Sequence, residues 1–541
     1  MISINYAIFC KLNLRIIFAY LNIYTFDQMK KVINKVKGTS SKVFDRVLNY
    51  IERAGNKLPH PATLFLILAV LVMVASWIAT VFDYSAVHPV DKSIIKANNL
   101  LSADGIRWIF ANLEKNFVEF PPLGLVLVVM IGIGVAEGSG MFTVLVRQLV
   151  LGAPKKLITA AIITAGIFSH LASEVGYVIL IPLGAMIFHA LGRHPMAGFA
   201  AAFCGVSAGF GSNFLIGSVD PILAGLSTSA AQILDPTMVI NPLVNYFFMV
   251  ASAIMIVIAG TWITEKIIEP RLGEYTGNVE KLEATELSSV EKKGLKYAGW
   301  SVLVLIAIIA LMLVPSNGML RDPETGSILH SPFMKGIIFV LLLVFFIPGL
   351  VYGKIVGTIK NDKDVVKHMT HSMKGLAGYI VLVFFAAQFV YFFRYSNIGL
   401  IVAINGANGL SNIGLTGIPL MILFVLLAAF INLFMGSASA KWAIMAPVFI
   451  PMFMLLGYHP ALTQAAFRIG DSVTNVITPM MSYFALIVTY AEKYDEKYGI
   501  GTIISLMIPY TILFLLLWIV LLIGWMQLGI PIGFDGPLYL R

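Results

Sequence analysis

Residues 436–479 read GSASAKWAIMAPVFIPMFMLLGYHPALTQAAFRIGDSVTNVITP, and this stretch decides how the rest of the chain is interpreted. It lies in strongly apolar sequence, yet it contains Lys441, Arg468, Asp471 and several Ser, Thr and Asn residues. Charged side chains are expensive to bury in lipid, so they are expected to face a protein interior or a water-filled cavity. The stretch therefore predicts a polar site inside a membrane protein.

The composition of the whole chain supports a membrane location. Of 541 residues, 58% are hydrophobic and 12% are charged, and the mean hydropathy is +0.87. A soluble domain carries about a quarter charged residues. Several apolar runs exceed the roughly 20 residues that a helix needs to cross a bilayer. The net charge of +9 is attributed to cytoplasmic loops, and no basic stretch interleaved with aromatic residues indicates nucleic-acid binding. The two cysteines form no CxxC pair, so neither a disulfide framework nor a thiolate metal site is expected.

Apolar runs and their breaks divide the chain into five segments. They are 1–60, an N-terminal extension with a basic amphipathic surface helix near 43–53; 61–264, a first membrane half; 265–296, a cytoplasmic linker; 297–528, a second membrane half; and 529–541, a C-terminal tail. Crossings are expected near 61–82, 121–151, 195–234, 242–263, 300–315, 334–351, 376–393, 461–490 and 502–526. A second amphipathic surface helix is expected near 365–373, among lysines.

Two further segments are better explained as re-entrant hairpins than as crossings. Residues 157–191 are too long for one span, have polar residues in the middle and have basic residues at both ends. We expect this segment to enter from the cytoplasm, turn near Glu174 and return. Residues 418–456 are the second hairpin candidate, with a turn at 436–442. Irregular backbone at membrane depth is tolerated only against protein or a water-filled cavity.

The two hairpin segments belong to an internal repeat. The sequence ASEVGYVILIPLGAMIFHALGRHP, from Ala172, resembles ASAKWAIMAPVFIPMFMLLGYHP, from Ala438. Pro182 matches Pro447, a displacement of 447 − 182 = 265 positions, and 191–195 matches 456–460 at the same displacement. Polar breaks follow in both copies, at 212–217 and 474–479. Such repeats with broken helices are typical of secondary transporters.

The number of crossings between the copies sets their relative orientation. Five crossings separate them, and five is odd, so the second copy is inverted relative to the first. We therefore predict an all-α polytopic membrane protein with nine transmembrane helices, two re-entrant hairpins and inverted-topology repeats. The N-terminus would be cytoplasmic and the C-terminus outside.

These motifs resemble those of a known family. GSASAKWAIMAPVFIPMF, QAAFRIGDSVTNVITPMMSYFALI and the first-half segment GVSAGFGSNFLIGSVDPILAGLS are similar to sequences of the AbgT family, the p-aminobenzoyl-glutamate transporters. The likeness extends from about Val47 to the last crossing. It implies a homodimer in the bacterial inner membrane and cation-coupled movement of aminobenzoyl-glutamate, a folate breakdown product. Some members of the family are thought instead to export sulfonamide antimetabolites.

The chemistry of such a solute selects candidate residues. Its two carboxylates suit a planar Arg fork and the N-terminal ends of half-helices, and unwound carbonyls and Asn side chains suit Na⁺. Substrate-binding candidates are Asn213, Asn432, Ser439, Trp442, Arg468 and Asn475. Cation-coupling candidates are Asp220, Asp471, Ser212 and Thr474, with a possible Na⁺ at Asn213, Asn475 and Asp471; Gly217 and Pro479 would shape the breaks. No cofactor is expected beyond the coupling ion, Na⁺ or H⁺.

Each candidate has a structural alternative that the sequence leaves open. Arg468 could pair with Asp471, which follows three residues later on the same helical face. Trp442 could stack on the solute ring or simply pack. Asn432 could serve helix–helix hydrogen bonding, and Lys441 could satisfy carbonyls of the hairpin tip.

Other functions are also considered. Within transport, the alternatives are a proton-driven exporter of sulfonamide-type compounds and a Na⁺/dicarboxylate symporter. An intramembrane enzyme is a different class, but no HExxH or paired-aspartate protease motif occurs. No GxxxxGK[ST] motif occurs, which argues against ATP as the energy source of this chain. The sequence thus predicts a transporter and not an enzyme.

Overall fold

The structure is a computed structural model that describes residues 59–87, 92–171, 176–277, 287–328, 331–481 and 483–540. The amphipathic helix expected near 43–53 and the turn expected at Glu174 lie outside these residues. Within them, eight helical segments are long and apolar enough to cross a bilayer, or up to nine with one bent pair. The eight are α3 (Pro61–Val81), α4 with α5 (Ala103–Gly138), α11 with α12 (Tyr246–Leu272), α13 (Ser289–Leu313), α15 (Ile337–Val356), α17 (Ala377–Tyr395), α20 (Ala438–Leu455) and α23 (Ile500–Leu528).

The first half departs from the prediction at its second crossing. The expected crossing over 121–151 is wrong as a single element, because α5 (Pro121–Gly138) ends before Gly140, whose φ of 84° is left-handed. A separate helix, α6 (Met141–Leu151), follows, and it is bent by 112° from the segment Lys155–Leu171. Glycine adopts a positive φ readily, so the chain turns here although its apolar composition continues.

Two short elements lie in the polar segment that precedes α5. β1 (Ser85–Val87) and β2 (Ile94–Lys96) form an antiparallel pair, and α4 (Ala103–Val118) begins after the Ser102 side chain accepts a hydrogen bond from the Gly105 amide at 3.1 Å. A Ser at this position satisfies one of the unpaired amides of a helix start. α4 and α5 together form one long helical segment, which contains a window that is apolar enough to cross a bilayer.

The first repeat copy contains two short helices, a turn and a broken helix. α7 (Ile158–Phe168) and α8 (Ile181–Ala190) form the arms of the first hairpin candidate. α9 (Pro195–Phe203) continues through a π-helical turn, η4 (Cys204–Ala208), and stops. α10 (Val219–Ala231) starts after irregular backbone over 209–218, which contains the break expected at 212–217.

The second copy has the same order of elements. α19 (Gly417–Asn432) and α20 are the arms of the second hairpin candidate, α21 (Pro460–Asn475) is the broken helix, and α22 (Phe484–Glu492) follows the break. The turn between α19 and α20 covers only 433–437. The expected turn at 436–442 was therefore placed too late, and Ser439, Lys441 and Trp442 lie in the first turns of α20.

Matched local geometry supports the repeat. Gly192 and Gly457, which are 265 positions apart, both have a left-handed φ, at 75° and 88°. The Nδ1 atoms of His194 and His459 each accept a hydrogen bond from the backbone amide two residues later at 3.2 Å. Both histidines therefore cap the following helix.

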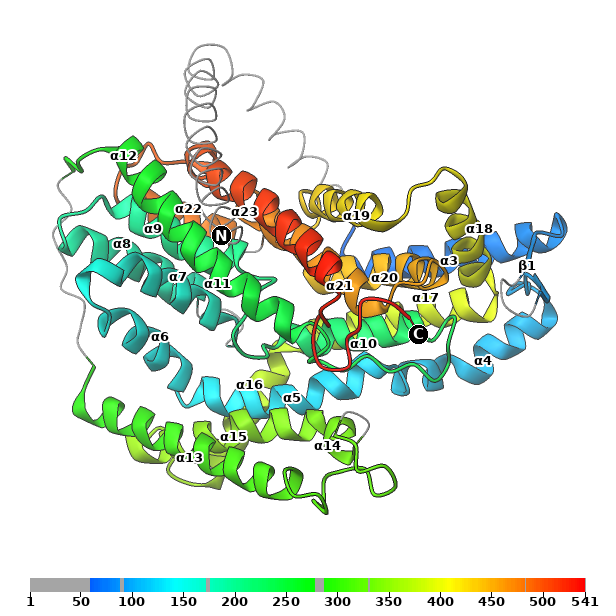
Figure 1. Cartoon of the computed structure of the whole chain (residues 1–541), viewed down its shortest axis with the longest axis horizontal. Helices are drawn as coiled ribbons and strands as arrows, with labels where there is room; N and C mark the ends of the chain where they lie inside the picture. The colour runs from blue at the N-terminus through cyan, green and yellow to red at the C-terminus, as the bar shows by residue number, and fades with distance from the viewer. Residues whose placement is uncertain are drawn as a thin grey trace, which may run out of the picture. The chain divides into compact units, whose positions relative to one another are not determined.

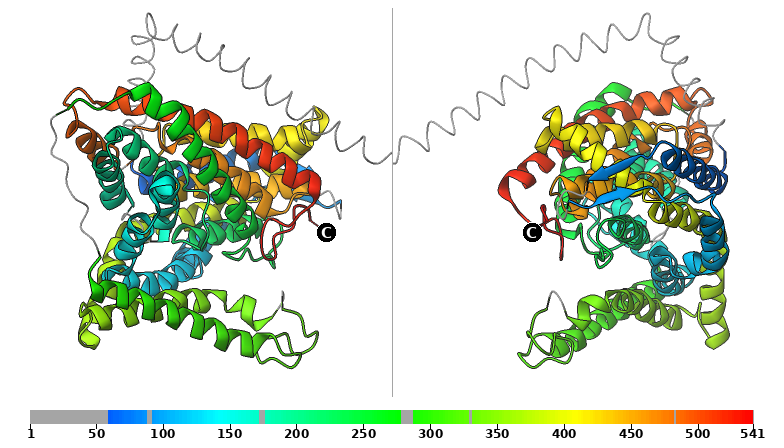
Figure 2. Two further views of the ribbon diagram at one scale, coloured as in Figure 1. Left: turned by 60° about the vertical axis from the view of Figure 1, so that its left-hand side comes forward. Right: turned by 90° about the vertical axis from the view of Figure 1, so that its right-hand side faces the viewer.

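The copies pack against each other around the broken helices. α10 of the first copy contacts α20 of the second, α22 of the second contacts α8 of the first, and α21 contacts α19 and η4. Figure 1 shows α20, α21 and α10 side by side, with α13 and α15 at a separate edge, and Figure 2 shows that edge from two further directions. α5 joins the two regions because it contacts both α15 and α10.

Small residues permit the close contacts of α5. A Cβ on Gly132 would lie 2.4 Å from the Leu342 carbonyl oxygen, and a Cβ on Gly349 would lie 2.6 Å from the Ala136 backbone. Helices in lipid associate through such close packing because hydrophobic burial drives little association there.

The C-terminal tail packs against the second copy. The His459 amide donates to the Leu538 carbonyl at 3.0 Å, and the Leu540 amide donates to the Gly457 carbonyl at 2.9 Å. Near the start of the tail, the Ile532 carbonyl accepts a hydrogen bond at 3.0 Å from the Phe248 amide, which lies in the first turn of α11. The tail thus fastens the α20–α21 turn to α11.

Candidate functional site

One face of α21 carries the polar groups of the site. Gln464, Arg468, Asp471 and Asn475 follow one another at spacings of four, three and four residues, which places them on the same side of a helix. All four are buried, with exposed fractions of 1–7%. The helix that holds them begins at Pro460 behind the His459 cap and ends at Asn475. This buried polar stripe is the core of the candidate site.

Arg468 pairs with an acid from the other repeat copy. Its Nη2 lies 2.5 Å from the Asp220 Oδ1, and the Asp220 Oδ2 accepts a hydrogen bond from the Gly217 amide at 2.6 Å. The sequence alternative, a pair with Asp471, is wrong in this structure. The Arg468 Nη1 is buried and has no hydrogen-bond partner among the described residues. Half of the guanidinium fork is therefore available to another acceptor.

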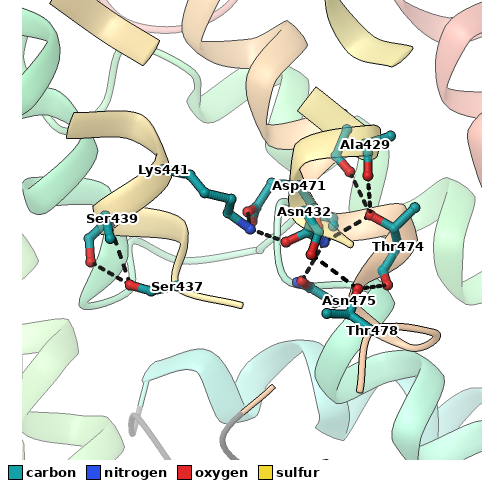
Figure 3. A network of polar contacts seen from close by, with 12 residues as sticks. Ala429, Asn432, Ser437, Ser439, Lys441, Asp471, Thr474, Asn475 and Thr478 are labelled. Carbon is teal, nitrogen blue, oxygen red and sulfur yellow. Dashed lines mark hydrogen bonds and ion pairs between the residues drawn. The ribbon is translucent and has the colours of Figure 1, made fainter. Parts of the chain in front are cut away.

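A second buried ion pair lies one turn farther along α21. The Lys441 Nζ is 2.5 Å from the Asp471 Oδ1, and it also contacts the Asn432 Oδ1 (Figure 3). Lys441 therefore contacts side chains of two other helices, whereas the sequence suggested the carbonyls of the hairpin tip. Its side chain is fully buried. A buried ammonium is tolerated only when it is paired and hydrogen-bonded, and both conditions hold here.

Asn432 connects the ion pair to the second break. Its Nδ2 donates to the Asp471 carbonyl at 2.6 Å, to the Thr474 Oγ1 at 2.8 Å and to the Asn475 Oδ1 at 2.8 Å (Figure 3). The Thr478 Oγ1 donates to the Asn432 carbonyl at 3.2 Å. The end of α19 and the end of α21 are thereby held together. Asn432 therefore makes the helix–helix contact, and its role in substrate binding stays a prediction.

Asn475 also reaches the first copy. Its Nδ2 donates to the Ser207 carbonyl, in the π-helical end of α9, at 3.4 Å. Thr474 uses its hydroxyl within its own half, where it donates to the Ala429 carbonyl at 3.2 Å. Pro479 lies in the break that follows, between α21 and α22. The ends of the two broken helices therefore meet.

The first break uses its polar side chains locally. The Asn213 Oδ1 accepts hydrogen bonds from the amides of Phe214 and Leu215 at 2.9 and 3.4 Å, and the Ser212 hydroxyl donates to the Gly209 carbonyl at 2.8 Å. Gly217 lies against the short turn that follows α7, since a Cβ there would be 3.0 Å from the His170 carbonyl oxygen. Ion and solute contacts for these residues stay a prediction.

Metal ligands of the usual kinds do not gather in the described part of the chain. No group of three or more His, Cys, Asp or Glu side chains is placed to hold a metal ion there. The predicted Na⁺ site would instead use Asn oxygens, backbone carbonyls and one carboxylate, which hard cations accept. Asn213 and Asn475 lie on the two different breaks, and Asp471 is occupied by Lys441.

Trp442 and Ser439 lie apart from the ion pairs. The Trp442 Nε1 donates to the Ser227 Oγ at 3.0 Å, and the indole stacks on Phe467 with centroids 4.5 Å apart. The indole is fully buried, so in this structure it contacts protein groups on all sides. Ser439 contacts the Ser437 hydroxyl at 3.3 Å in the first turn of α20. Their substrate roles stay predictions.

A second polar network was missed by the sequence reasoning. The Ser227 Oγ donates to the Gln464 Oε1 at 2.6 Å, and the Gln464 Nε2 donates to the Asn245 Oδ1 at 2.7 Å. Asn245 in turn donates to the Ala461 carbonyl at 2.8 Å. The signal for Gln464 was present, because it precedes Arg468 by four residues. No sequence signal pointed to Asn245, because it lies in a loop that is far from Gln464 in the sequence.

An aromatic pair also lies beside the breaks. Tyr177, between the two arms of the first hairpin, stacks on Tyr483 with centroids 5.0 Å apart and the rings 9° from parallel. The Tyr177 hydroxyl donates to the Ser207 Oγ at 3.4 Å. Nothing in the local pattern distinguished these tyrosines from the others in the chain.

One motif that looks catalytic has no catalytic setting. Residues 205–209, GVSAG, fit the pattern GxSxG of a hydrolase nucleophile. That pattern requires a sharp strand-to-helix turn, but Ser207 lies in the π-helical end of α9. The Ser207 hydroxyl contacts the Met481 sulfur at 3.4 Å, and no histidine base contacts it among the described residues.

Comparisons with known proteins identify what the chain resembles. The model of the AbgT putative transporter family matches residues 46–540. The p-aminobenzoyl-glutamate transport protein of Escherichia coli (strain K12) is 41% identical over 495 residues, which are 91% of this chain and 97% of that protein.

Two solved structures agree in fold. The Alcanivorax borkumensis YdaH transporter, described as having an unusual topology, is 44% identical with a TM-score of 0.82, over 88% of this chain and all of that one. Neisseria gonorrhoeae MtrF, described as illuminating a class of antimetabolite efflux pumps, is 48% identical with a TM-score of 0.86, over 91% of this chain and all of that one.

Proposed function

Because the chain belongs to the AbgT family of transporters, we propose that it moves p-aminobenzoyl-glutamate across the bacterial inner membrane by cation-coupled alternating access. The family and the relatives are transporters and not enzymes. The choice of solute rests on the 41% identity to a p-aminobenzoyl-glutamate transport protein.

The observation that carries the proposal is the half-satisfied Arg468. Its Nη2 pairs with Asp220, while its Nη1 is buried without a partner among the described residues. A buried unpaired N–H costs roughly 1–3 kcal/mol, and more where the group is charged. A solute carboxylate would satisfy that nitrogen, and a bidentate grip would also compete with Asp220. Solute binding would therefore loosen the contact between the repeat copies.

Cation coupling follows from the same competition. An Asp220 released by the solute would be a buried, unpaired carboxylate, which is strongly unfavourable. Uptake of H⁺ or Na⁺ by Asp220, or by Asp471 if Lys441 moves away, would compensate that charge. The coupling ion would then be required whenever the solute occupies the site.

Export of sulfonamide-type antimetabolites is the second candidate. It is supported by the 48% identity to a structure described as an antimetabolite efflux pump. A proton-driven exporter could use the same ion pairs, with H⁺ displacing Arg468 from Asp220. A Na⁺/dicarboxylate symporter is the third form, in which both solute carboxylates and no aromatic ring are recognised.

The assembly is proposed to be a homodimer with the N-terminus in the cytoplasm and the C-terminus outside. Large apolar side chains on α4 support a further contact with lipid or protein, because Phe110 is 85% exposed and Val118 is 61% exposed. Crosslinking of the purified protein in membranes would test the dimer.

Transport of labelled p-aminobenzoyl-glutamate into proteoliposomes tests the solute and the coupling together. We expect accumulation driven by an imposed Na⁺ or H⁺ gradient, and little accumulation without one. Arg468→Lys should keep a positive charge near Asp220 but lose the planar guanidinium that can bind a carboxylate with two hydrogen bonds. We therefore expect this variant to accumulate the solute at least tenfold less than wild type. Arg107→Lys, in an exposed pair with Asp104, is the control. If neither gradient drives accumulation of this solute while a sulfonamide is expelled, the export function replaces the first.

A further inference from the structure

A basic surface lies on α16 (Asp362–Gly375), between the membrane-spanning helices α15 and α17. Residues 354–374 contain five lysines and two aspartates, a net charge of 5 − 2 = +3. The two aspartates occupy the first turn of α16, where Asp364 caps the helix start. None of the lysines on α16 forms an ion pair with a carboxylate in the part of the chain that the structure describes. This surface therefore keeps a net positive charge.

The surface is hollowed into a groove of about 590 Å³. Residues that line it include Lys363, Lys367, Lys374, His371, Val366 and Gly138. Val366 is 57% exposed among these charges. The neighbouring His368 also lines the groove, and its Nε2 is buried with no hydrogen-bond partner among the described residues. The groove thus combines cations, an unsatisfied ring nitrogen and an exposed apolar side chain.

The groove is fixed in place by contacts with α5. The Ser372 Oγ donates to the Met130 carbonyl at 3.2 Å, and a Cβ on Gly134 would lie 2.4 Å from the Ser372 Cβ. A Cβ on Gly138 would lie 2.3 Å from the His368 Nδ1. α16 is therefore packed onto a membrane-spanning helix and is not a free surface segment.

The position of α16 along the chain places it at the membrane boundary. α15 ends at Val356 and α17 begins at Ala377, and both are apolar enough to span a bilayer. A helix that connects two spans on one side lies close to their ends, where lipid phosphate groups are found. Lysines in such a place attract anionic lipid, at about 1 kcal/mol for each lysine near the surface.

We propose that this groove binds the phosphate headgroup of an anionic phospholipid. Lys363, Lys367 and Lys374 would contact the phosphate oxygens, and the acyl chains would pass Val366 into the bilayer. A lipid fits better than a soluble anion, because only a lipid has acyl chains that can contact the exposed valine and enter the bilayer beside the ends of the two spans. The site is separate from the ion pairs of α21, so it stands whether or not the transported solute is correctly assigned.

Native mass spectrometry of the full-length purified protein tests the proposal. The protein is titrated with phosphatidylglycerol in a detergent that also contains phosphatidylcholine, and retained lipids are counted. We expect wild-type protein to retain phosphatidylglycerol, and K363Q/K367Q/K374Q to bind it about tenfold or more weakly. The control K292Q/K293Q/K296Q removes the same charge from exposed lysines at the start of α13, which line no groove of α16, and should lose much less binding than K363Q/K367Q/K374Q does.

Two outcomes would overturn the proposal. Equal losses in the two triple variants would show that total charge, and not the groove, attracts the lipid. Displacement of the lipid by inorganic phosphate at millimolar concentration would show that the site binds a free anion. A thermal unfolding midpoint in detergent, measured for both variants, ensures that weakened binding is compared between folded proteins. K363R/K367R/K374R keeps the charges and should restore binding.

Discussion

At the scale of single residues, Asp220 separates solute binding from coupling. Asp220→Asn removes the charge that competes for Arg468, so the variant should bind p-aminobenzoyl-glutamate at least as tightly as wild type. It should nevertheless lose gradient-driven accumulation, because no carboxylate remains there to take up a cation. Equilibrium binding and uptake into proteoliposomes, measured on the same preparation, check this split. If Asp220→Asn instead binds the solute more weakly than wild type, the proposed competition between the solute and Asp220 is refuted.

Lys441 gives a prediction about stability. Lys441→Met leaves Asp471 buried without its cation, which should destabilise the fold by about 3–5 kcal/mol. Lys441→Met combined with Asp471→Leu removes both charges and should recover most of that loss. The control, Lys96→Met, breaks an exposed 2.9 Å pair with Asp83 and should change stability by about 1 kcal/mol or less. Thermal unfolding in detergent ranks the stabilities of the variants. If the double variant is as unstable as Lys441→Met, the unpaired charge of Asp471 is not the cause of the lost stability.

The residues of the site were predictable in type but not in pairing. Helical spacing placed Arg468 and Asp471 on one face, and the same spacing includes Gln464. The partner of Arg468 is 248 positions away in the sequence, so local pattern could offer only the acid three residues along. Asp220 was singled out for its charge at a helix break, without its contact being predictable. Long-range pairing is decided by how the copies pack.

At the scale of elements, the matched turns of the two copies provide a paired test. Gly192 and Gly457 have a left-handed φ, and a Cβ at either position would meet no neighbouring atom. Gly192→Ala and Gly457→Ala should each destabilise by about 1 kcal/mol from backbone strain alone. Gly378→Ala, in α17 with equally open surroundings and no positive φ, should not destabilise. Unequal effects on the unfolding midpoint would show that the two turns are not equivalent.

The start of α16 should respond to pH. The Asp364 carboxylate accepts hydrogen bonds from the amides of Lys360 at 2.8 Å and Asn361 at 3.2 Å, and these bonds lower its pKa from 3.8. A lowered pKa means that the cap stabilises the helix start above pH 3.8 and is lost as the pH falls through the lowered value.

Hydrogen exchange over 360–366 measures this effect. Asp364→Asn should exchange faster than wild type at pH 7, and the difference should vanish well below pH 3.8, where both side chains are neutral. A difference of the same size at both pH values would exclude the carboxylate as its cause. Asp362→Asn, on the same turn, is the control because no hydrogen bond from it is part of the capping box.

Element boundaries were harder to predict than element types. Most crossings were found near their expected positions because apolar length decides them. The crossing over 121–151 failed as one element because the left-handed Gly140 separates two helices within it, near the polar residues Glu137 and Ser139. α18 (Ile398–Asn412) was not expected, since its glycines and asparagines weaken the helical signal. Its packing against α20 and α3 compensates for that weak propensity.

At the scale of the whole molecule, the C-terminal tail is part of the fold. Its Ile532 and Leu538 are buried, and its backbone bonds reach both α11 and the α20–α21 turn. Removal of residues 530–541 should therefore lower the thermal unfolding midpoint by a few degrees.

Leu538→Ala, which removes the buried side-chain atoms at one position of the tail, should lower the free energy of unfolding by about 2–5 kcal/mol. Leu528→Ala, at a position that is 73% exposed, is the control and should have little effect.

The matched turns of the repeat were predictable from sequence because their residues occur at the same displacement in both copies. The GxHP match pairs a left-handed glycine with a histidine cap in both copies, and both features appear in the structure. How the copies interlock was not predictable, because the contacts of α10 with α20 and of α22 with α8 join residues that are far apart in the sequence.

The two buried ion pairs have an electrical consequence. Moving one elementary charge across the membrane potential changes the free energy by about 2.3 kcal/mol per 100 mV. Arg468 and Lys441 are balanced by Asp220 and Asp471, so the empty site has zero net charge. The conformational change that returns the empty site from one side of the membrane to the other would then move no net charge. Voltage would act only on the step in which the site carries the solute and its accompanying ions.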